Sequence, residues 1–188
     1  MNVADLKKLA KESAVLAGSS AGRRMCNLLL ESAKASQPGL FLLDASGVDV
    51  ATSSFMREAI VEFRNLVRRD MPDIYPVLTG LKPDVEEELV GLLNQIGEAF
   101  WLFEISKRII KKHRLIGRID PKLKETLELI ERGHGYDAAT LWKSTNSTES
   151  VGVTAWNNRL ANLSRQGLVF ESRVGKQKYF HPLHNFQD

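Results

Sequence analysis

The fold of the first half is decided by residues 39–55, GLFLLDASGVDVATSSF. The wholly apolar run at 40–43 lies between a glycine and an aspartate, as is typical of a strand covered on both faces in a sheet flanked by helices. Residues 44–47 then have the composition of a turn, and Thr-Ser-Ser at 52–54 offers side-chain oxygens that cap a helix. A strand, a loop and a capped helix in this order predict a layered α/β domain.

The segments around this stretch repeat the alternation of helices and short strands. From the spacing of apolar residues, helices are expected over 4–17, 21–36, 55–67 and 83–96, and strands over 40–43, 74–78 and 99–103. Pro76 cannot donate a ladder hydrogen bond, so its strand is predicted to lie at an edge of the sheet or to contain a bulge. Together these elements predict an α/β domain over residues 1–105.

Charge is distributed unevenly along the chain. The 188 residues include 26 basic and 23 acidic ones, which gives a net charge of +3. Residues 1–106 are acidic on balance, whereas 107–120 contain six basic residues and one acidic residue. We interpret residues 106–120 as a basic linker, which either touches a DNA backbone or is a solvated connector. Its basic residues are Lys107, Arg108, Lys111, Lys112, Arg114 and Arg118.

A second domain is expected over residues 121–188. The spacing of apolar residues predicts helices over 123–130, 138–142 and 153–163. Two short strands, 168–173 and 176–180, flank Val174-Gly175 and predict a β-hairpin.

The order of three helices and a β-hairpin over residues 121–183 resembles a winged helix-turn-helix domain. The run Leu160–Val169, LANLSRQGLV, is similar to the end of that family's recognition helix and the start of its wing. The resemblance implies that Ser150 to Arg165 forms the recognition helix, that Arg173 to Lys178 forms the wing, and that double-stranded DNA is the partner. The sequence departs from the family in its asparagine-rich helix and in Glu149 near the helix N-terminus.

Helical geometry predicts which side chains of this domain would contact DNA. In a helix over 153–165 the apolar residues face inward and a polar face is exposed. The candidate residues are Thr154, Asn157, Asn158, Asn162 and Arg165 on the helix, with Arg173, Lys176 and Lys178 in the hairpin. Asparagine pairs with adenine, threonine meets a thymine methyl group, and arginine holds guanine or a phosphate. The alternative is an ordinary solvated face, and the modest positive charge suggests that specific binding needs a homodimer.

The first half resembles the STAS-like domains, relatives of the anti-sigma-factor antagonists, and in particular a bacterial STAS-like family of unknown function. Leu40–Val48, a strand that ends in aspartate, and Ala51–Met56, a serine-bearing loop that opens a helix, carry the match. In antagonists of this type a partner kinase phosphorylates a serine at the start of that helix, where Ser53 and Ser54 fall. The usual Asp-Ser-Ser-Gly context is absent, and helix capping alone is the alternative role of both serines.

Sequence patterns for catalysis and metal binding are absent. The single cysteine, Cys26, excludes an internal disulfide and a Cys-based zinc site, and the four histidines lack metal-ligand spacing. There is no phosphate-cradling glycine loop, nucleophile elbow or HExxH motif. No apolar run is long enough for a membrane span, and the N-terminus lacks the apolar core of a secretory signal. We therefore expect a non-enzymatic, cytoplasmic protein without cofactor, metal or membrane partner.

Two functional hypotheses follow from these features. In the first, the chain is a DNA-binding transcriptional regulator whose STAS-like domain receives a protein partner, such as a kinase, or a phosphorylation signal. In the second, it is a non-enzymatic adaptor that uses both domains for protein–protein interaction, which the moderate basic charge of the helix and wing leaves open. A third hypothesis is a small-ligand sensor in the α/β domain, which no sequence motif supports.

Overall fold

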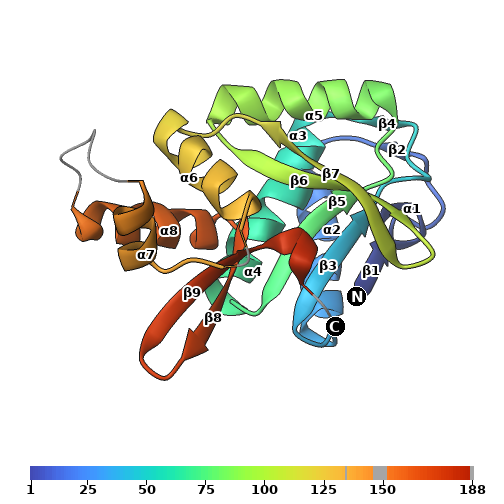
Figure 1. Ribbon diagram of the computed structural model, residues 1–188. Helices are drawn as coiled ribbons and strands as arrows, with labels where there is room; N and C mark the ends of the chain where they lie inside the picture. The colour runs from blue at the N-terminus through green and yellow to red at the C-terminus, as the bar shows by residue number, and fades with distance from the viewer. Residues whose placement is uncertain (134, 146–151, 187–188) are drawn as a thin grey trace. The chain divides into compact units, whose positions relative to one another are not determined.

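The computed structural model describes residues 1–133, 135–145 and 152–186 (Figure 1). The chain divides into two compact units, Met1–Arg118 and the residues from Ile119 onward. Every residue of the N-terminal unit is described. No helix in the described part of the chain combines the length and the apolar character that a bilayer crossing requires.

The N-terminal unit is built on a mixed five-stranded sheet with the order β1-β3-β5-β6-β7. The strands are β1 (Asn2–Asp5), β3 (Gly39–Asp44), β5 (Ile74–Thr79), β6 (Ala99–Ser106) and β7 (Ile109–Gly117). The first four are parallel, whereas β7 pairs antiparallel with β6. A separate parallel pair joins β2 (Val15–Leu16) to β4 (Val50–Ala51). The α/β class predicted from the apolar run at 40–43 is thereby confirmed.

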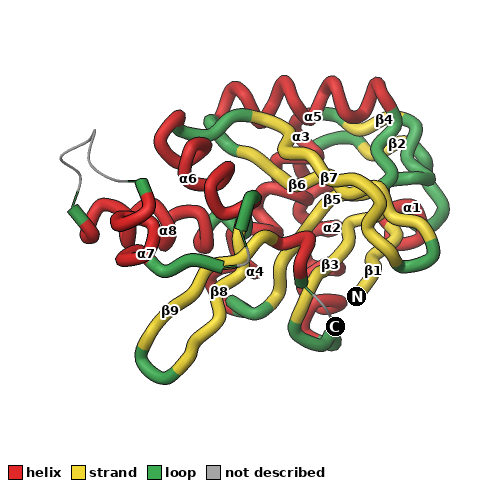
Figure 2. The backbone as a smooth tube through the Cα atoms, in the orientation of Figure 1, coloured by secondary structure: helices red, strands yellow, loops and turns green. Residues whose placement is uncertain are grey.

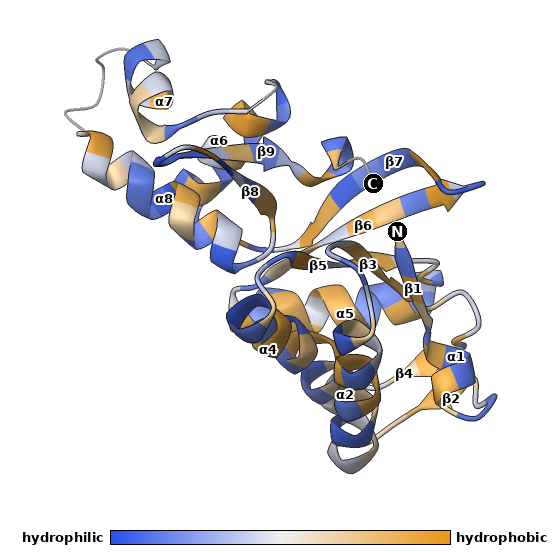
Figure 3. Cartoon of the chain, turned by 90° about the horizontal axis from the view of Figure 1, so that it is seen from below, coloured by the Kyte–Doolittle hydropathy of each residue, from blue (hydrophilic) through white to orange (hydrophobic). Residues whose placement is uncertain are grey.

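Helices on one face of this sheet connect its parallel strands. They are α2 (Ser19–Lys34), α3 (Ser53–Met56), α4 (Glu62–Asp70) and α5 (Pro83–Ile96), and a π-helical turn, η1 (Arg57–Val61), makes the chain helical from α3 to α4. Figure 3 shows α2, α4 and α5 together on one side of the sheet. Right-handed crossovers between successive neighbouring strands place all of their helices on the same side.

The core between these helices and the sheet is closely packed. Phe41 of β3 and Phe63 of α4 are fully buried, with ring centroids 5.4 Å apart. Gly22 lets α2 approach α3, because a Cβ atom there would lie 2.6 Å from the carbonyl oxygen of Phe55. Cys26 is buried in the same helix, and burial raises the pKa of its thiol to about 11. The thiol therefore stays protonated and poorly reactive at neutral pH.

A charged side chain, Arg64 of α4, is buried at the edge of this core with only 2% of its surface exposed. Its Nη1 donates to the carbonyl oxygen of Ala99 at 2.8 Å, and its Nη2 donates to a carboxylate oxygen of Glu98 at 2.7 Å. The guanidinium also lies 4.4 Å from the ring centroid of Phe100. Its Nε and Nη2 also donate to Oδ1 of the neighbouring Asn65. Arg64 thus ties α4 to the start of β6 through Glu98, Ala99 and Phe100.

The helix predicted over residues 4–17 is wrong. Asn2–Asp5 instead pairs in parallel with β3 as β1, and the helix that follows, α1, covers only Leu6–Leu9. Asp5 caps α1 by accepting a hydrogen bond from the backbone of Lys8 at 3.0 Å. Lys11 and Glu12 then adopt positive φ values, which end the helical turn. The pairing of β1 with β3 outweighs the local helical spacing, since tertiary contacts routinely override intrinsic propensity.

The expectation that Pro76 marks an edge strand or a bulge is also wrong, because β5 is the central strand, between β3 and β6, and its register with β3 is unbroken. Pro76 lies opposite Phe41 in the ladder with β3. The ladder with β6 involves only Leu78 and Thr79 of β5. Pro76 lies outside that second ladder, so its missing N–H costs no hydrogen bond to β6.

Most of the segment predicted as a basic linker is a strand. Ile109–Gly117 forms β7 at the edge of the sheet, and the two units divide just beyond it. Two of its cations are held by acidic side chains of the same unit. Arg114 Nη2 lies 2.5 Å from a carboxylate oxygen of Glu86, and Lys112 Nζ lies 3.5 Å from one of Glu104. The charges fit an edge strand, where lysines discourage pairing with another chain.

The C-terminal unit contains the predicted helices and hairpin in the predicted order (Figure 2). Its described elements are α6 (Pro121–Glu131), α7 (Ala138–Ser144), α8 (Val153–Arg165), β8 (Val169–Val174), β9 (Gln177–Pro182) and the 3-10 turn η2 (Leu183–Asn185). The carboxylates of Asp120 and Asp137 cap α6 and α7 by accepting backbone hydrogen bonds. Ser150 and Glu149, which the winged-helix resemblance places at the start of the recognition helix, lie outside the described residues.

Candidate nucleic-acid interface

Helix α8 separates an apolar side from a polar one. Trp156, Leu160 and Leu163 recur at helical spacing and are buried. The helix ends where Gly167 adopts a φ of +72°, and the backbone N–H of Leu168 bonds to the carbonyl oxygen of Leu163 at 2.9 Å. This cap turns the chain directly into β8, so the helix and the hairpin follow each other without a linker.

The polar side of α8 carries most of the residues predicted to contact DNA. The exposed ones are Thr154, Asn157, Asn158 and Arg165. Asn162 is half-buried, and its side-chain oxygen accepts a hydrogen bond from Nε2 of Gln166 at 3.0 Å. That oxygen is therefore engaged, whereas a bidentate pair with adenine needs both amide atoms. From Thr154 to Arg165 the exposed face spans about 16 Å, roughly the height of five stacked bases.

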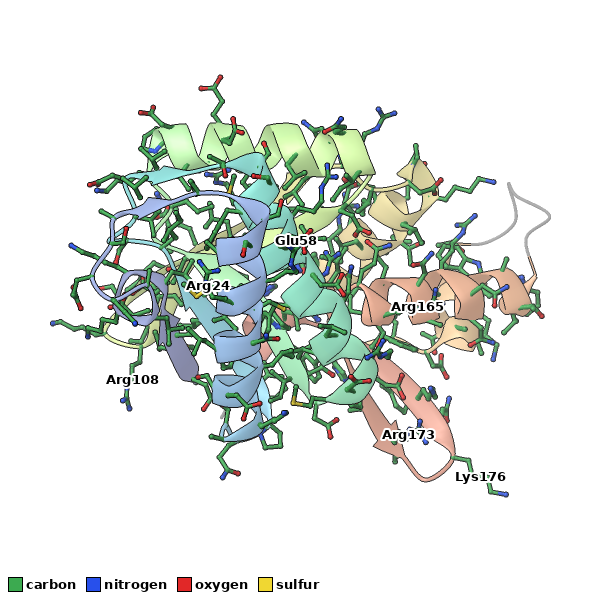
Figure 4. The ribbon with its side chains drawn as sticks, turned by 180° about the vertical axis from the view of Figure 1, so that it is seen from behind. Arg24, Glu58, Arg108, Arg165, Arg173 and Lys176 are labelled. Carbon is green, nitrogen blue, oxygen red and sulfur yellow. The ribbon has the colours of Figure 1, made fainter. Side chains whose placement is uncertain are left out.

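The hairpin presents the other predicted residues. Its strands are joined by the two-residue turn Gly175-Lys176, one residue later than predicted. Gly175 has a φ of +62°, which two-residue hairpin turns require and which glycine adopts without strain. Arg173, Lys176 and Lys178 are all exposed. In Figure 4, Arg173 and Lys176 lie on the hairpin and Arg165 lies on α8.

Sequence reasoning missed an acidic residue, Glu171, in the middle of this basic hairpin. Its carboxylate lies 3.2 Å from Nε of Arg173 and 2.9 Å from Nζ of Lys178. Two of the three predicted hairpin cations are therefore neutralised locally, whereas Lys176 makes no ion pair with a described residue. The sequence did contain a signal for the pair Glu171–Arg173. Residues two apart on a strand point to the same face of the sheet, and these two residues have that spacing.

A second missed residue, Arg159, lies at the border between the two sides of α8. Its guanidinium carbon is 4.9 Å from the ring centroid of Trp156, which is a cation–π distance. The contact holds a positive charge in a fixed orientation beside the exposed face. Trp156 and Arg159 lie at i and i+3, about one helical turn apart, so their contact could have been predicted from the sequence.

The serines singled out in the N-terminal unit have different surroundings. Thr52, not either serine, caps the helix, because its Oγ1 accepts the backbone N–H of Phe55 at 3.3 Å. The hydroxyl of Ser53 donates to a carboxylate oxygen of Glu88 on α5, and its backbone N–H donates to the same oxygen at 3.1 Å. Ser54 is exposed. Ser54 is thus open to modification, whereas Ser53 is committed to a contact between helices.

Comparisons of the chain with known protein families, with curated proteins and with solved structures find no match. What the molecule does must therefore be inferred from its own residues.

Proposed function

We propose that the chain is a DNA-binding transcriptional regulator. Its C-terminal unit would be a winged helix that reads double-stranded DNA with α8, and its N-terminal unit a STAS-like domain that receives a protein partner or a phosphorylation signal. The observation that carries this proposal is the exposed polar face of α8, followed without a linker by a basic hairpin. Both surfaces belong to one compact unit, so one duplex can engage them together.

The backbone of the C-terminal unit supports the winged-helix assignment. Tyr136, in the segment between α6 and α7, exchanges two hydrogen bonds with Phe180 of β9, at 3.0 and 2.9 Å. This bridge fixes the hairpin against the first two helices. Gly135 permits it, because its φ is +132° and a Cβ atom there would lie 2.4 Å from the ring of His181.

The side chains on α8 suggest how the readout would work. The Asn158 amide can pair bidentately with adenine, the Thr154 methyl group can meet thymine, and Arg165 can hold guanine or a phosphate. Lys176 at the hairpin turn can reach a phosphate, which needs only charge and reach. Because Arg173 and Lys178 both pair with Glu171, the non-specific affinity should be weak, and a homodimer would double the contacts.

The proposal is tested by selection from a random-sequence duplex pool with the full chain. We expect enrichment of a short motif of about five base pairs, either alone or as an inverted repeat if the chain binds as a dimer. A pool that stays random after selection at low salt contradicts DNA reading.

One observation favours the adaptor as a second candidate. Glu171 pairs with Arg173 and Lys178 in the hairpin, where a DNA-binding wing needs positive charge to bind phosphates. In the adaptor, α8 and the hairpin would bind an acidic or polar protein surface instead of a duplex. Cross-linking of the full chain would identify the protein partner of such an adaptor. Added duplex DNA would not displace that partner, because the adaptor binds no DNA.

Replacing Glu171 with glutamine distinguishes these candidates. Because Arg173 and Lys178 lose their shared partner, we expect Glu171→Gln to bind duplex DNA several-fold more tightly. The slope of log K against log salt should steepen by about one to two. The matched control is Glu128→Gln, which removes one negative charge from the exposed surface of α6 in the same unit. Equal slopes for the two variants would remove the hairpin from the interface.

For the N-terminal unit, we propose phosphorylation at the start of α3 as the input. A phosphate on exposed Ser54 would lie at the positive end of the helix dipole, and the dipole would stabilise the negative charge of the phosphate. A phosphate on Ser53 would face the carboxylate of Glu88 and push α3 away from α5. The two serines would therefore act differently: Ser54 would alter a surface, and Ser53 would alter the packing of two helices.

Glutamate substitutions separate the two serines. We expect Ser53→Glu to lower the free energy of unfolding of the N-terminal unit by about 1–2 kcal/mol, since it replaces a charge-assisted hydrogen bond with repulsion. Ser54→Glu should leave stability unchanged within about 0.5 kcal/mol. Urea unfolding followed by circular dichroism measures both. Adding Glu88→Lys to Ser53→Glu should restore the lost stability, and a failure to do so would contradict the assigned contact.

A further inference from the structure

A groove in the N-terminal unit has no part in the proposed DNA binding. It has a volume of about 500 Å³ and lies between residues 21–28 of α2 and the segment that joins α1 to β2. Its lining is mainly apolar and includes Leu9, Val15, Leu16, Met25, Leu28 and Phe55. The size lies in the range of small-ligand sites, which are mostly apolar with a few polar groups.

The floor and the rim of this groove differ in exposure. Leu16, Met25 and Phe55 are buried, so the floor is already packed. On the rim, Val15 is 57% exposed and Leu28 is 45% exposed. Large apolar side chains exposed beside a concave surface mark a place that a bound apolar group would cover.

Two cations, Lys11 and Arg24, complete the lining, and no acidic residue is among the residues that line this fully described groove. Both are exposed, and neither makes an ion pair with a described residue. Arg24 Nη1 donates to Oγ of Ser20 at 2.9 Å, which orients the guanidinium. The neighbouring Arg23 instead lies 3.6 Å from a carboxylate oxygen of Glu58, outside the groove. Figure 4 shows Arg24 on α2 and Glu58 on the adjacent helix.

A strained backbone turn at Lys11 and Glu12 keeps Lys11 in the lining of the groove. Lys11 and Glu12 have φ values of 55° and 66°, which cost about 1–3 kcal/mol each in residues other than glycine. Hydrogen bonds from their N–H groups to the carbonyl oxygens of Lys8 and Lys7, at 3.0 and 2.9 Å, hold this turn. The tight turn keeps Lys11 in the lining and leads the chain back to Val15.

We propose that the groove binds a small amphiphilic anion, an aliphatic carboxylate with a single chain. Its apolar chain would cover Val15 and Leu28, and its carboxylate would accept hydrogen bonds from Lys11 and Arg24. A carboxylate fits better than a neutral or cationic head group, because the charged residues of the lining are both basic. The proposal does not rest on DNA binding by the C-terminal unit.

The groove is connected to the start of α3 by hydrogen bonds to the backbone and the side chain of Thr52. Leu16 of the groove floor pairs with Ala51 in the short β2–β4 ladder. The backbone N–H of Thr52 donates to the carbonyl oxygen of Leu16 at 3.0 Å, and that of Gly18 donates to Oγ1 of Thr52 at 3.2 Å. A bound carboxylate would therefore stabilise the segment that presents Ser54.

Calorimetric titration of the full chain with decanoate tests the proposal, with decan-1-ol and decyltrimethylammonium as probes of the head group. We expect saturable binding of one decanoate per chain, about tenfold or more tighter than decan-1-ol, since charge-assisted hydrogen bonds are lost with the alcohol. Arg24→Ala should weaken decanoate binding about tenfold and leave decan-1-ol unaffected. The matched control, Arg23→Ala, removes an arginine from the same helix but outside the groove and should change neither.

The apolar wall is tested separately with Leu28→Ser, which should weaken both decanoate and decan-1-ol. Val174→Ser, which removes an exposed apolar side chain from the hairpin instead, is its control. The proposal is overturned if decanoate does not saturate, if decyltrimethylammonium binds as tightly as decanoate, or if Arg24→Ala and Arg23→Ala behave alike.

Discussion

The double variant Asn158→Ala/Arg165→Ala is expected to bind all duplexes alike. Both residues are exposed on the polar side of α8, while the residues that hold the helix in place lie on its other side. Each good bidentate contact to a base discriminates by about 1–3 kcal/mol, so the loss of two is worth a factor of about 30 or more in specificity. The measurement is the ratio of affinities for the selected duplex and a scrambled one.

Two controls accompany this variant. Lys124→Ala removes an exposed charge from α6, and Asn94→Ala removes an exposed amide from α5; neither should change the affinity ratio. The thermal unfolding of the double variant should match that of the parent chain, because exposed substitutions cost within about 0.5 kcal/mol. Unchanged discrimination by the double variant would remove α8 from the reading role.

Arg64→Ala should cause the largest loss of stability, about 3–5 kcal/mol in the N-terminal unit. The substitution leaves a cavity beside Phe100 and deprives the carbonyl oxygen of Ala99 of its donor. Glu98 also loses its counter-charge. Arg69→Ala is the control on the same helix, since Arg69 is exposed and pairs with the exposed Asp70. Its expected cost is within about 0.5 kcal/mol.

Cys26 provides a specific readout for this comparison. It is the single cysteine of the chain, it is buried, and its pKa is raised to about 11. A thiol reagent should therefore label the native protein slowly at neutral pH, and only as the N-terminal unit opens. Arg64→Ala should speed labelling by a factor of about 100 or more, if labelling follows the opening equilibrium. Similar labelling rates for Arg64→Ala and Arg69→Ala would show that Arg64 does not stabilise the core.

Local sequence patterns predicted the helices and strands in which the spacing of apolar residues by itself shows which side chains are buried. The apolar run at 40–43 is short and unbroken, so it identified β3, and the amphipathic stripes of α2, α5 and α8 were equally clear. The failures involved pairing between distant segments. Asn2–Asp5 became a strand because β3 was available beside it, and Pro76 was tolerated in a central strand because the β6 ladder starts beyond it. Neither fact is visible in a local window.

The same distinction holds for the candidate interface. Helical geometry identified the exposed face of α8, and four of its five predicted residues are exposed. It could not identify the engaged oxygen of Asn162, which depends on the rotamer of Gln166. It also missed Glu171, whose effect on Lys178 depends on the register of the hairpin. Contacts between side chains on different strands follow from register, and a shift of one residue in the predicted turn was enough to obscure them.

The measurement that tests DNA reading most directly is fluorescence anisotropy of the full chain with the selected duplex and with a scrambled duplex, across a salt series. We predict that the selected duplex binds tighter by a factor of about 30 or more, and that the affinity for both duplexes falls linearly in log K against log salt. Equal affinity for the two duplexes, or no binding at low salt, would contradict the proposal that α8 and the hairpin read DNA.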